Sequence, residues 1–125
     1  MSAMKLLVVD DEPAILKYMH ALLTDWGHQV VSLCLDSEQT AADVLEQVKL
    51  REFDGALVGF MMPAMFGTEL AAQIKRVSPA TKIIIMIEAV PPALADALRL
   101  EGVDFGQLPA PFEREALCRQ LSGVI

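Results

Sequence analysis

The sequence predicts an α/β fold in which a doubly wound parallel sheet of five strands carries helices on both faces. Five short apolar runs alternate with five amphipathic segments along the 125 residues. The apolar runs are nearly continuous, which is typical of strands that are buried on both faces. Strands that alternate with helices in this way are joined by right-handed crossovers and form a parallel sheet.

The first strand and the first helix have clear boundaries. Lys5–Val9 is an apolar run that leads into the acids Asp10–Glu12. A helix begins at Pro13, because the first turn of a helix does not need the N–H that proline lacks. Gly27 ends this helix. The apolar residues that recur at helical spacing between them are Ile15, Leu16, Met19, Leu22, Leu23 and Trp26.

The second strand (Gln29–Leu33) and the third strand (Gly55–Phe60) are each followed by an amphipathic helix. The helix after the second strand is expected to open at Asp36 or Ser37, whose side chains can accept a hydrogen bond at a helix N-terminus. The helix after the third strand begins after Gly67. The apolar residues predicted to face inward are Ala41, Val44, Leu45 and Val48 in the first of these helices, and Leu70, Ala71, Ile74 and Val77 in the second.

The fourth strand, Lys82–Ile87, is an isoleucine-rich run of the kind that is buried on both faces. Pro91–Pro92 opens the fourth helix, which ends near Gly102. The fifth strand, about Phe105–Leu108, has the weakest signal. The fifth helix is expected from about Glu113 to Leu121.

One domain is expected to span residues 1–125, because this length is close to the commonest domain size. Hydrophobic residues make up 54% of the chain, which excludes a disordered protein. Apolar runs such as Ile83–Ile87 are too short to cross a bilayer, and the N-terminus has no secretory apolar region. We therefore expect a cytoplasmic protein. Cys34 and Cys118 lie far apart without metal-ligand spacing, so both are expected to be reduced.

The charge pattern points to protein partners. The formal net charge is -7, and among the scattered basic residues only Lys75 and Arg76 are adjacent. Binding to nucleic acid requires clustered cations that release counterions from phosphates. Nucleic acids and anionic membranes are therefore not expected as partners.

Acids and a glycine follow two strands that can be neighbours. Asp10, Asp11 and Glu12 follow the first strand, and Gly59 ends the third. In doubly wound sheets ligands bind at the carboxyl ends of the strands, near the point where the strand order reverses. Paired carboxylates there would suit Mg²⁺. Acids before Pro13 equally suit the first turn of a helix, where they cap it and complement its dipole, so both interpretations stay open.

Three motifs in this order resemble the receiver domains of bacterial response regulators. They are Asp10-Asp11 after the first strand, the loop Met61–Gly67 with its Met-Met-Pro start, and Pro111-Phe112 before the last helix. The resemblance covers the whole chain. It implies a flavodoxin-like (βα)5 sheet with strand order 2-1-3-4-5. It also implies a switch in which an aspartate accepts a phosphoryl group, Mg²⁺ neutralises charge, and a hydroxyl and a lysine hold the phosphoryl oxygens.

Several positions depart from that family pattern. Gly59 lies four places before Pro63, where the family has the phosphate-accepting aspartate. Glu88 occupies the position of the threonine or serine, and Ala110 that of the lysine. The aromatic that reports switching is replaced by Gln107, with Phe105 nearby. Phosphoryl transfer depends on positioned charge, so these losses together should abolish it.

The resemblance then implies a degenerate receiver that is not an enzyme and requires no cofactor. It would act as a phosphorylation-independent protein-interaction module. Its partners would be a signalling kinase, an output domain or another regulator, and a homodimer through the fourth helix, fifth strand and fifth helix is an expectation from the family. Asp10 and Asp11 match the metal-binding acids, so Mg²⁺ remains possible. Glu88 is either a solvated side chain or a third acid that reaches toward them.

Two other functions stay open. A phosphorelay receiver could use another acceptor such as Asp36, whereas Asp54 is expected at the wrong edge of the sheet. A flavodoxin-like domain could also bind a small ligand, although no glycine-rich phosphate loop follows the first strand. His20 and His28 are expected at the surface, and no serine or cysteine is placed to form a triad with them.

Overall fold

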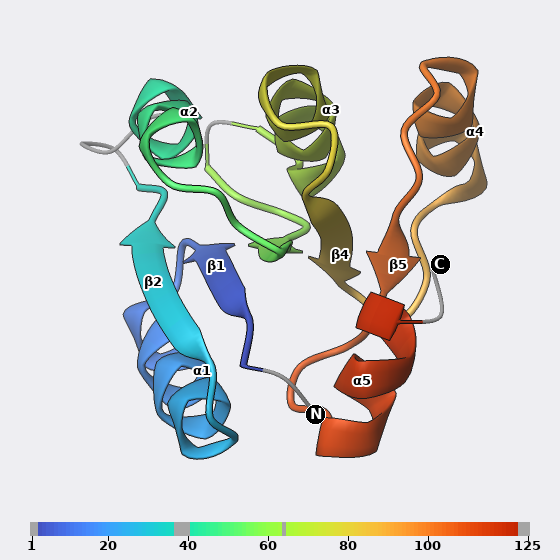
Figure 1. The fold of residues 1–125 in the computed structure, drawn as a ribbon. Coiled ribbons are helices and arrows are strands. Elements are labelled where there is room, and N and C mark those ends of the chain that lie inside the picture. Colours follow the sequence, from blue (N-terminus) through green and yellow to red (C-terminus); the bar gives the residue numbers. More distant parts are fainter. Residues whose placement is uncertain (1–2, 37–40, 64, 123–125) are drawn as a thin grey trace.

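The computed structural model describes residues 3–36, 41–63 and 65–122, and five parallel strands form one sheet in the order β2-β1-β3-β4-β5 (Figure 1). The strands are β1 (Lys5–Asp10), β2 (Gln29–Cys34), β3 (Gly55–Gly59), β4 (Lys82–Met86) and β5 (Gly106–Gln107). The helices are α1 (Pro13–Asp25), α2 (Ala41–Leu50), α3 (Gly67–Val77), α4 (Pro92–Leu100) and α5 (Arg114–Ser122). The predicted fold class and strand order are confirmed.

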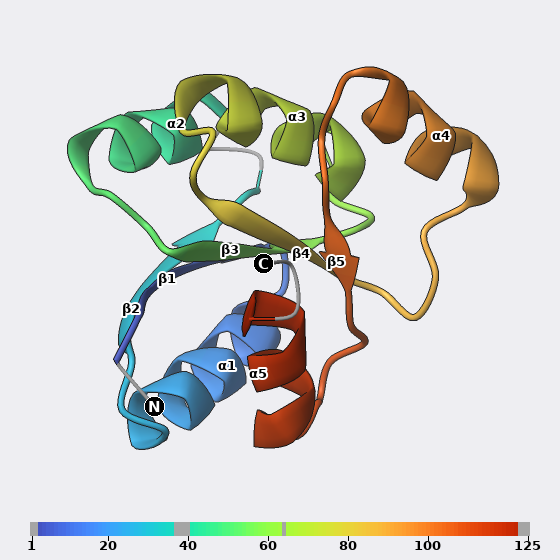
Figure 2. The ribbon, with the colours of Figure 1, turned by 45° about the vertical axis from the view of Figure 1, so that its right-hand side comes forward.

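The sheet separates two apolar cores. Helices α1 and α5 cover one face, and α2, α3 and α4 cover the other (Figure 2). Because successive side chains of a strand point to opposite faces, Leu6 and Val8 pack into the core beneath α1 and α5. Leu7 and Val9 pack into the core beneath the other three helices. All four side chains are fully buried, which explains why β1 is a continuous apolar run.

The boundaries differ from the predicted ones mainly at the edges of the sheet. Strand β5 has only the two residues Gly106–Gln107 instead of the predicted Phe105–Leu108, and it pairs with β4 alone. Phe105 instead lies under the guanidinium of Arg99, 5.8 Å from the ring centroid. Helix α2 is described from Ala41, so a start at Ser37 lies outside the described residues, and Asp36 lies ahead of the helix.

The end of α1 follows the prediction. Trp26 donates its backbone N–H to Leu22 at 3.1 Å, and Gly27 has φ 95°, a conformation that favours glycine. Among the described helices, none combines the length and the apolar composition needed to cross a bilayer.

The predicted surface position of His28 is wrong. Its side chain is only 6% exposed, and its Nδ1 accepts the backbone N–H of Met4 at 3.1 Å. An accepting Nδ1 carries no proton, so the ring is neutral in this geometry. Burial lowers the pKa of His28, and the positive charge of Arg114 lowers it further. His20 is exposed, as predicted, and its Nδ1 lies 3.0 Å from Ser32 Oγ.

Lowering the pH from about 7 to about 5.5 is expected to reduce the free energy of unfolding by roughly 1 kcal/mol through His28. Because the pKa of His28 is lowered in the folded state, its contribution is complete above the ordinary histidine pKa. It is lost as the pH falls through the folded value. Urea unfolding at a series of pH values measures the effect. The dependence of the free energy of unfolding on pH should become weaker in His28→Gln and persist in His20→Gln. An unchanged dependence in His28→Gln would contradict the assignment of this effect to His28.

Candidate functional site

The carboxyl ends of β1 and β3 lie next to each other at the point where the strand order of the sheet reverses. The chain leaves β1 toward β2 and returns to β3 on the other side of β1. Val9 is paired with Val58, so the next residues, Asp10 and Gly59, lie side by side at the edge. A Cβ placed on Gly59 would lie 2.7 Å from Asp10 Oδ2. The carboxylate of Asp10 thus occupies the space that a side chain at Gly59 would enter.

The Asp10 carboxylate is held by the turn that follows β1. Its Oδ1 accepts the backbone N–H of Glu12 at 3.0 Å. Burial raises the pKa of Asp10, and a hydrogen bond and charge repulsion from Asp11 add to the rise, while the Glu12 N–H opposes it.

Cys34 Sγ donates to the carbonyl oxygen of Asp11 at 3.7 Å, and burial raises the pKa of this thiol. Cys34 and Cys118 are both thiols and are not joined in a disulfide, as predicted.

The loop between β3 and α3 folds back tightly onto the end of β3. Gly67 donates its backbone N–H to the Phe60 carbonyl at 2.6 Å, and Met61 and Phe66 form an antiparallel bridge. The rings of Phe60 and Phe66 stack with their centroids 5.2 Å apart. A Cβ on Gly67 would overlap the carbonyl oxygen of Gly59. The start of α3 can therefore approach β3 only because Gly67 has no side chain.

The other predicted site residues follow the other strands of the sheet. Glu88 is exposed beyond the end of β4, and Asp36 is exposed after β2. Ala110 is half-buried against the core beneath α1 and α5. Within residues 3–36, 41–63 and 65–122, no three His, Cys, Asp or Glu side chains are grouped so that they could hold a metal ion. The turn after β1 carries the carboxylates of Asp10, Asp11 and Glu12, of which Asp10 and Asp11 are the predicted metal ligands.

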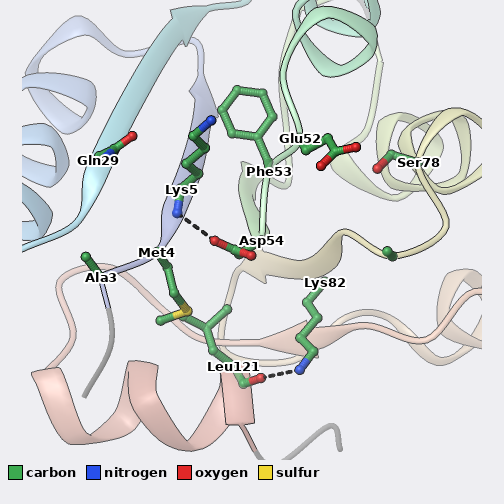
Figure 3. A pocket seen from close by; sticks show the side chains of 11 residues that line it. Ala3, Met4, Lys5, Gln29, Glu52, Phe53, Asp54, Ser78, Lys82 and Leu121 are labelled. Atoms are coloured by element: carbon green, nitrogen blue, oxygen red, sulfur yellow. Dashed lines mark hydrogen bonds between the residues drawn. The ribbon is translucent and has the colours of Figure 1, made fainter.

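A broad hollow of about 770 Å³ lies at the opposite edge of the sheet (Figure 3). Asp54 lines it and accepts the Lys5 backbone N–H at 2.8 Å, which confirms that Asp54 is at the amino edge. Lys82 also lines it and donates its ammonium to the Leu121 carbonyl at 2.9 Å. These charged groups already have backbone partners, and the hollow contains none of the acids that follow β1. Its size therefore does not mark it as the functional site.

One contact at the carboxyl ends of β4 and β5 was not predicted from the sequence. Gln107 Oε1 accepts the backbone N–H of Val90 at 2.8 Å, which links β5 to the loop after β4. The two residues are 17 positions apart, and no local pattern pairs them. The only available signal was the unusual glutamine in place of an aromatic residue.

Comparisons with known proteins give the family. The model of the response regulator receiver domain matches residues 6–122. The transcriptional regulatory protein ZraR of Escherichia coli O157:H7 is 31% identical over 118 residues, covering 87% of this chain and 25% of that protein. GlrR of Escherichia coli K12 is 30% identical over 122 residues, covering 96% of this chain and 26% of that protein. The chain thus spans about a quarter of the length of these relatives.

Solved structures agree with this match. The chemotaxis protein CheY4 of Vibrio cholerae superposes with a TM-score of 0.79 at 25% identity, covering 99% of this chain and all of that one (100%). Response regulator TrrA of Thermotoga maritima, solved in complex with Mg(2+)-BeF, has a TM-score of 0.73 at 20% identity, covering 98% and 99% of the two chains. At this identity the TrrA likeness concerns the fold alone. Since the family model covers nearly the whole chain, the protein belongs to the response regulator receiver domains.

Proposed function

We propose that this receiver acts without phosphorylation, as a protein-interaction module whose resting conformation is its signal. The observation that carries the proposal is the corner between Asp10 and Gly59. Gly59 has no side-chain oxygen that could attack phosphorus, and Asp10 Oδ2 lies 2.7 Å from the point where a side chain at this position would begin. An acceptor group is thus missing, and the Asp10 carboxylate crowds the place where it would start.

The positions that we assign to the other catalytic groups also carry none of the charges that phosphoryl transfer needs. We assign Ala110 to the lysine position and Glu88 to the hydroxyl position of the family. Ala110 packs on the core and cannot neutralise phosphoryl oxygens, and Glu88 would add negative charge if it approached them. Phosphoryl transfer is catalysed almost entirely by positioned charge, so these replacements act in the same direction as the loss of the acceptor.

The consequence follows from the energetics of two-state switches. A ligand shifts an equilibrium only if it binds the two states with different affinity. A receiver that cannot take up the phosphoryl group is not shifted by it. The conformation present at rest is then the one that partners recognise.

Receiver domains interact with kinases and with the output domains of response regulators, so we propose proteins of these classes as partners. A second copy of this chain, bound through α4, β5 and α5, is a further candidate.

Asp10 and Asp11 are the residues that would hold Mg²⁺, and the ion would neutralise their charge. The donor set fits, because Mg²⁺ is commonly bound by one or two carboxylates and keeps several water ligands. One Asp10 oxygen is already engaged by the Glu12 N–H, so Asp11 would supply a larger share of the binding.

No phosphoryl group is expected to be transferred to the chain. The protein is incubated with acetyl phosphate and Mg²⁺, and its intact mass is measured beside a receiver that has a complete site. An unchanged mass supports the proposal. A gain of one phosphoryl group contradicts it, and mass mapping together with Asp36→Asn would then test Asp36 as the acceptor.

Replacing Asp10 by asparagine is expected to stabilise the fold at neutral pH by about 0.5–1 kcal/mol, a range kept small because the group is partly solvated. Because the pKa of Asp10 is raised in the folded state, protonated Asp10 makes its full contribution to the free energy of unfolding below the ordinary aspartate pKa. This contribution is lost as the pH rises through the folded value. The gain should therefore vanish near pH 4, roughly the ordinary aspartate pKa. Urea unfolding of both proteins in EDTA measures it, with Asp25→Asn as the control. Equal stability at neutral pH would contradict the argument.

Magnesium is expected to raise the melting temperature through Asp10 and Asp11. At ten times the dissociation constant, a ligand that binds only the folded state adds about 1.4 kcal/mol to the free energy of unfolding. Thermal melts at increasing Mg²⁺ and constant ionic strength measure the shift. Asp11→Asn should abolish it and Asp25→Asn should not. A flat titration of the unaltered protein would exclude a magnesium site.

A further inference from the structure

The segment between β4 and α4 has few means of attachment to the sheet. Pro91 and Pro92 have no backbone N–H, so Val90 carries the last amide donor before the helix. That donor does not point to solvent: it binds Gln107 Oε1 at 2.8 Å. The Val90 side chain is buried as well, at 7% exposure, in the core beneath α2, α3 and α4. Val90 is thus fixed on both its backbone and its side chain.

The acceptor of this hydrogen bond is itself fixed in the sheet. Gln107 is paired with Ile85 of β4, and the following residue, Leu108, donates its N–H to the Ile85 carbonyl at 3.0 Å. The backbone on which the Gln107 side chain stands is therefore part of the parallel ladder. The amide oxygen reaches from this ladder across to the chain that enters α4.

The rest of α4 is anchored by a short buried stripe, by Leu94 packed against the core beneath α2, α3 and α4, and at its far end by the Arg76–Glu101 ion pair at 2.8 Å. It stands at the outer edge of the sheet above β5 (Figure 2), and its buried residues are Ala95 and Leu98. Its opposite end is held by Val103, which is buried and donates its N–H to the Leu98 carbonyl at 2.9 Å. Because the buried stripe is short, the ends of the helix decide its position to a large extent.

We propose that Gln107 is a positioning residue that holds the start of α4 against β5, so that the face formed by α4 and β5 keeps one arrangement. An aromatic ring in this place has no amide oxygen to offer the Val90 N–H. The hydrogen bond between Gln107 and Val90 is supported by its geometry alone. The inference that it keeps the face of α4 and β5 in one state for partners rests on the proposed function.

The test compares Gln107→Met, which keeps the length of the side chain and removes the strong acceptor, with Gln107→Glu, which keeps an acceptor oxygen. Amide hydrogen exchange of Val90 is measured in both. The Met variant should exchange at Val90 roughly fivefold to tenfold faster, as expected for the loss of one ordinary hydrogen bond. The Glu variant should stay close to the unaltered protein. Gln29→Met, at the exposed start of β2, is the matched control.

A second measurement needs no variant. The scalar coupling across a hydrogen bond between the Val90 amide nitrogen and the Gln107 side-chain carbonyl is expected in the unaltered protein. Its absence, or unchanged Val90 exchange in Gln107→Met, would overturn the contact. The amides of α4 should also exchange faster or broaden in Gln107→Met, while those of β1 and β3 stay unchanged. If Val90 alone responds, the hydrogen bond exists but does not position α4, and the proposal is wrong.

These outcomes are separate from those of the phosphorylation experiment. A chain that takes up phosphate while the Val90 amide stays protected would overturn the proposed function and leave the Gln107 contact in place. An unphosphorylated chain in which Gln107→Met has no effect would do the reverse.

Discussion

The parallel pairing of β1 with β3 is the constraint on which the rest of the structure depends. Strand β1 is buried on both faces, and the chain passes first to one side of it and then to the other. The carboxyl ends of the two strands therefore meet where the connections reverse, which is where such sheets bind ligands. Here the pairing brings Asp10 to Gly59, and Gly67 approaches the same glycine from α3. The corner can be this closely packed because two of its residues have no side chain.

The two parts of the molecule that bear on function lie along one side of this sheet. At the centre, Asp10 Oδ2 lies 2.7 Å from where a side chain at Gly59 would begin, and at the edge, the Gln107 side chain accepts the Val90 N–H that precedes α4. In the proposed function these features are complementary, since a receiver that is not switched by phosphate has no need of a mobile entry to α4. On that proposal, a hydrogen-bonding side chain at Gln107, in place of the aromatic that the family pattern has, keeps the surface fixed.

Several elements were predictable because their signals are local. The continuous apolar runs gave β1 and β4 to within one residue, and Gly27 gave the end of α1. Signals were weaker where neighbours decide the outcome. Strand β5 is shorter than predicted, with only two residues paired to β4. His28 is buried although it is polar, since the Met4 N–H satisfies its ring nitrogen.

The sequence by itself determined the α/β class, the run of alternating elements and the glycine at position 59, because periodicity and residue identity are properties of the chain alone. The motifs also indicated the family. Only the tertiary structure decided what fills the space beside Gly59 and what the amide of Val90 binds. Both depend on side chains brought together by the sheet from distant parts of the chain, and their distances follow from packing that no local pattern encodes.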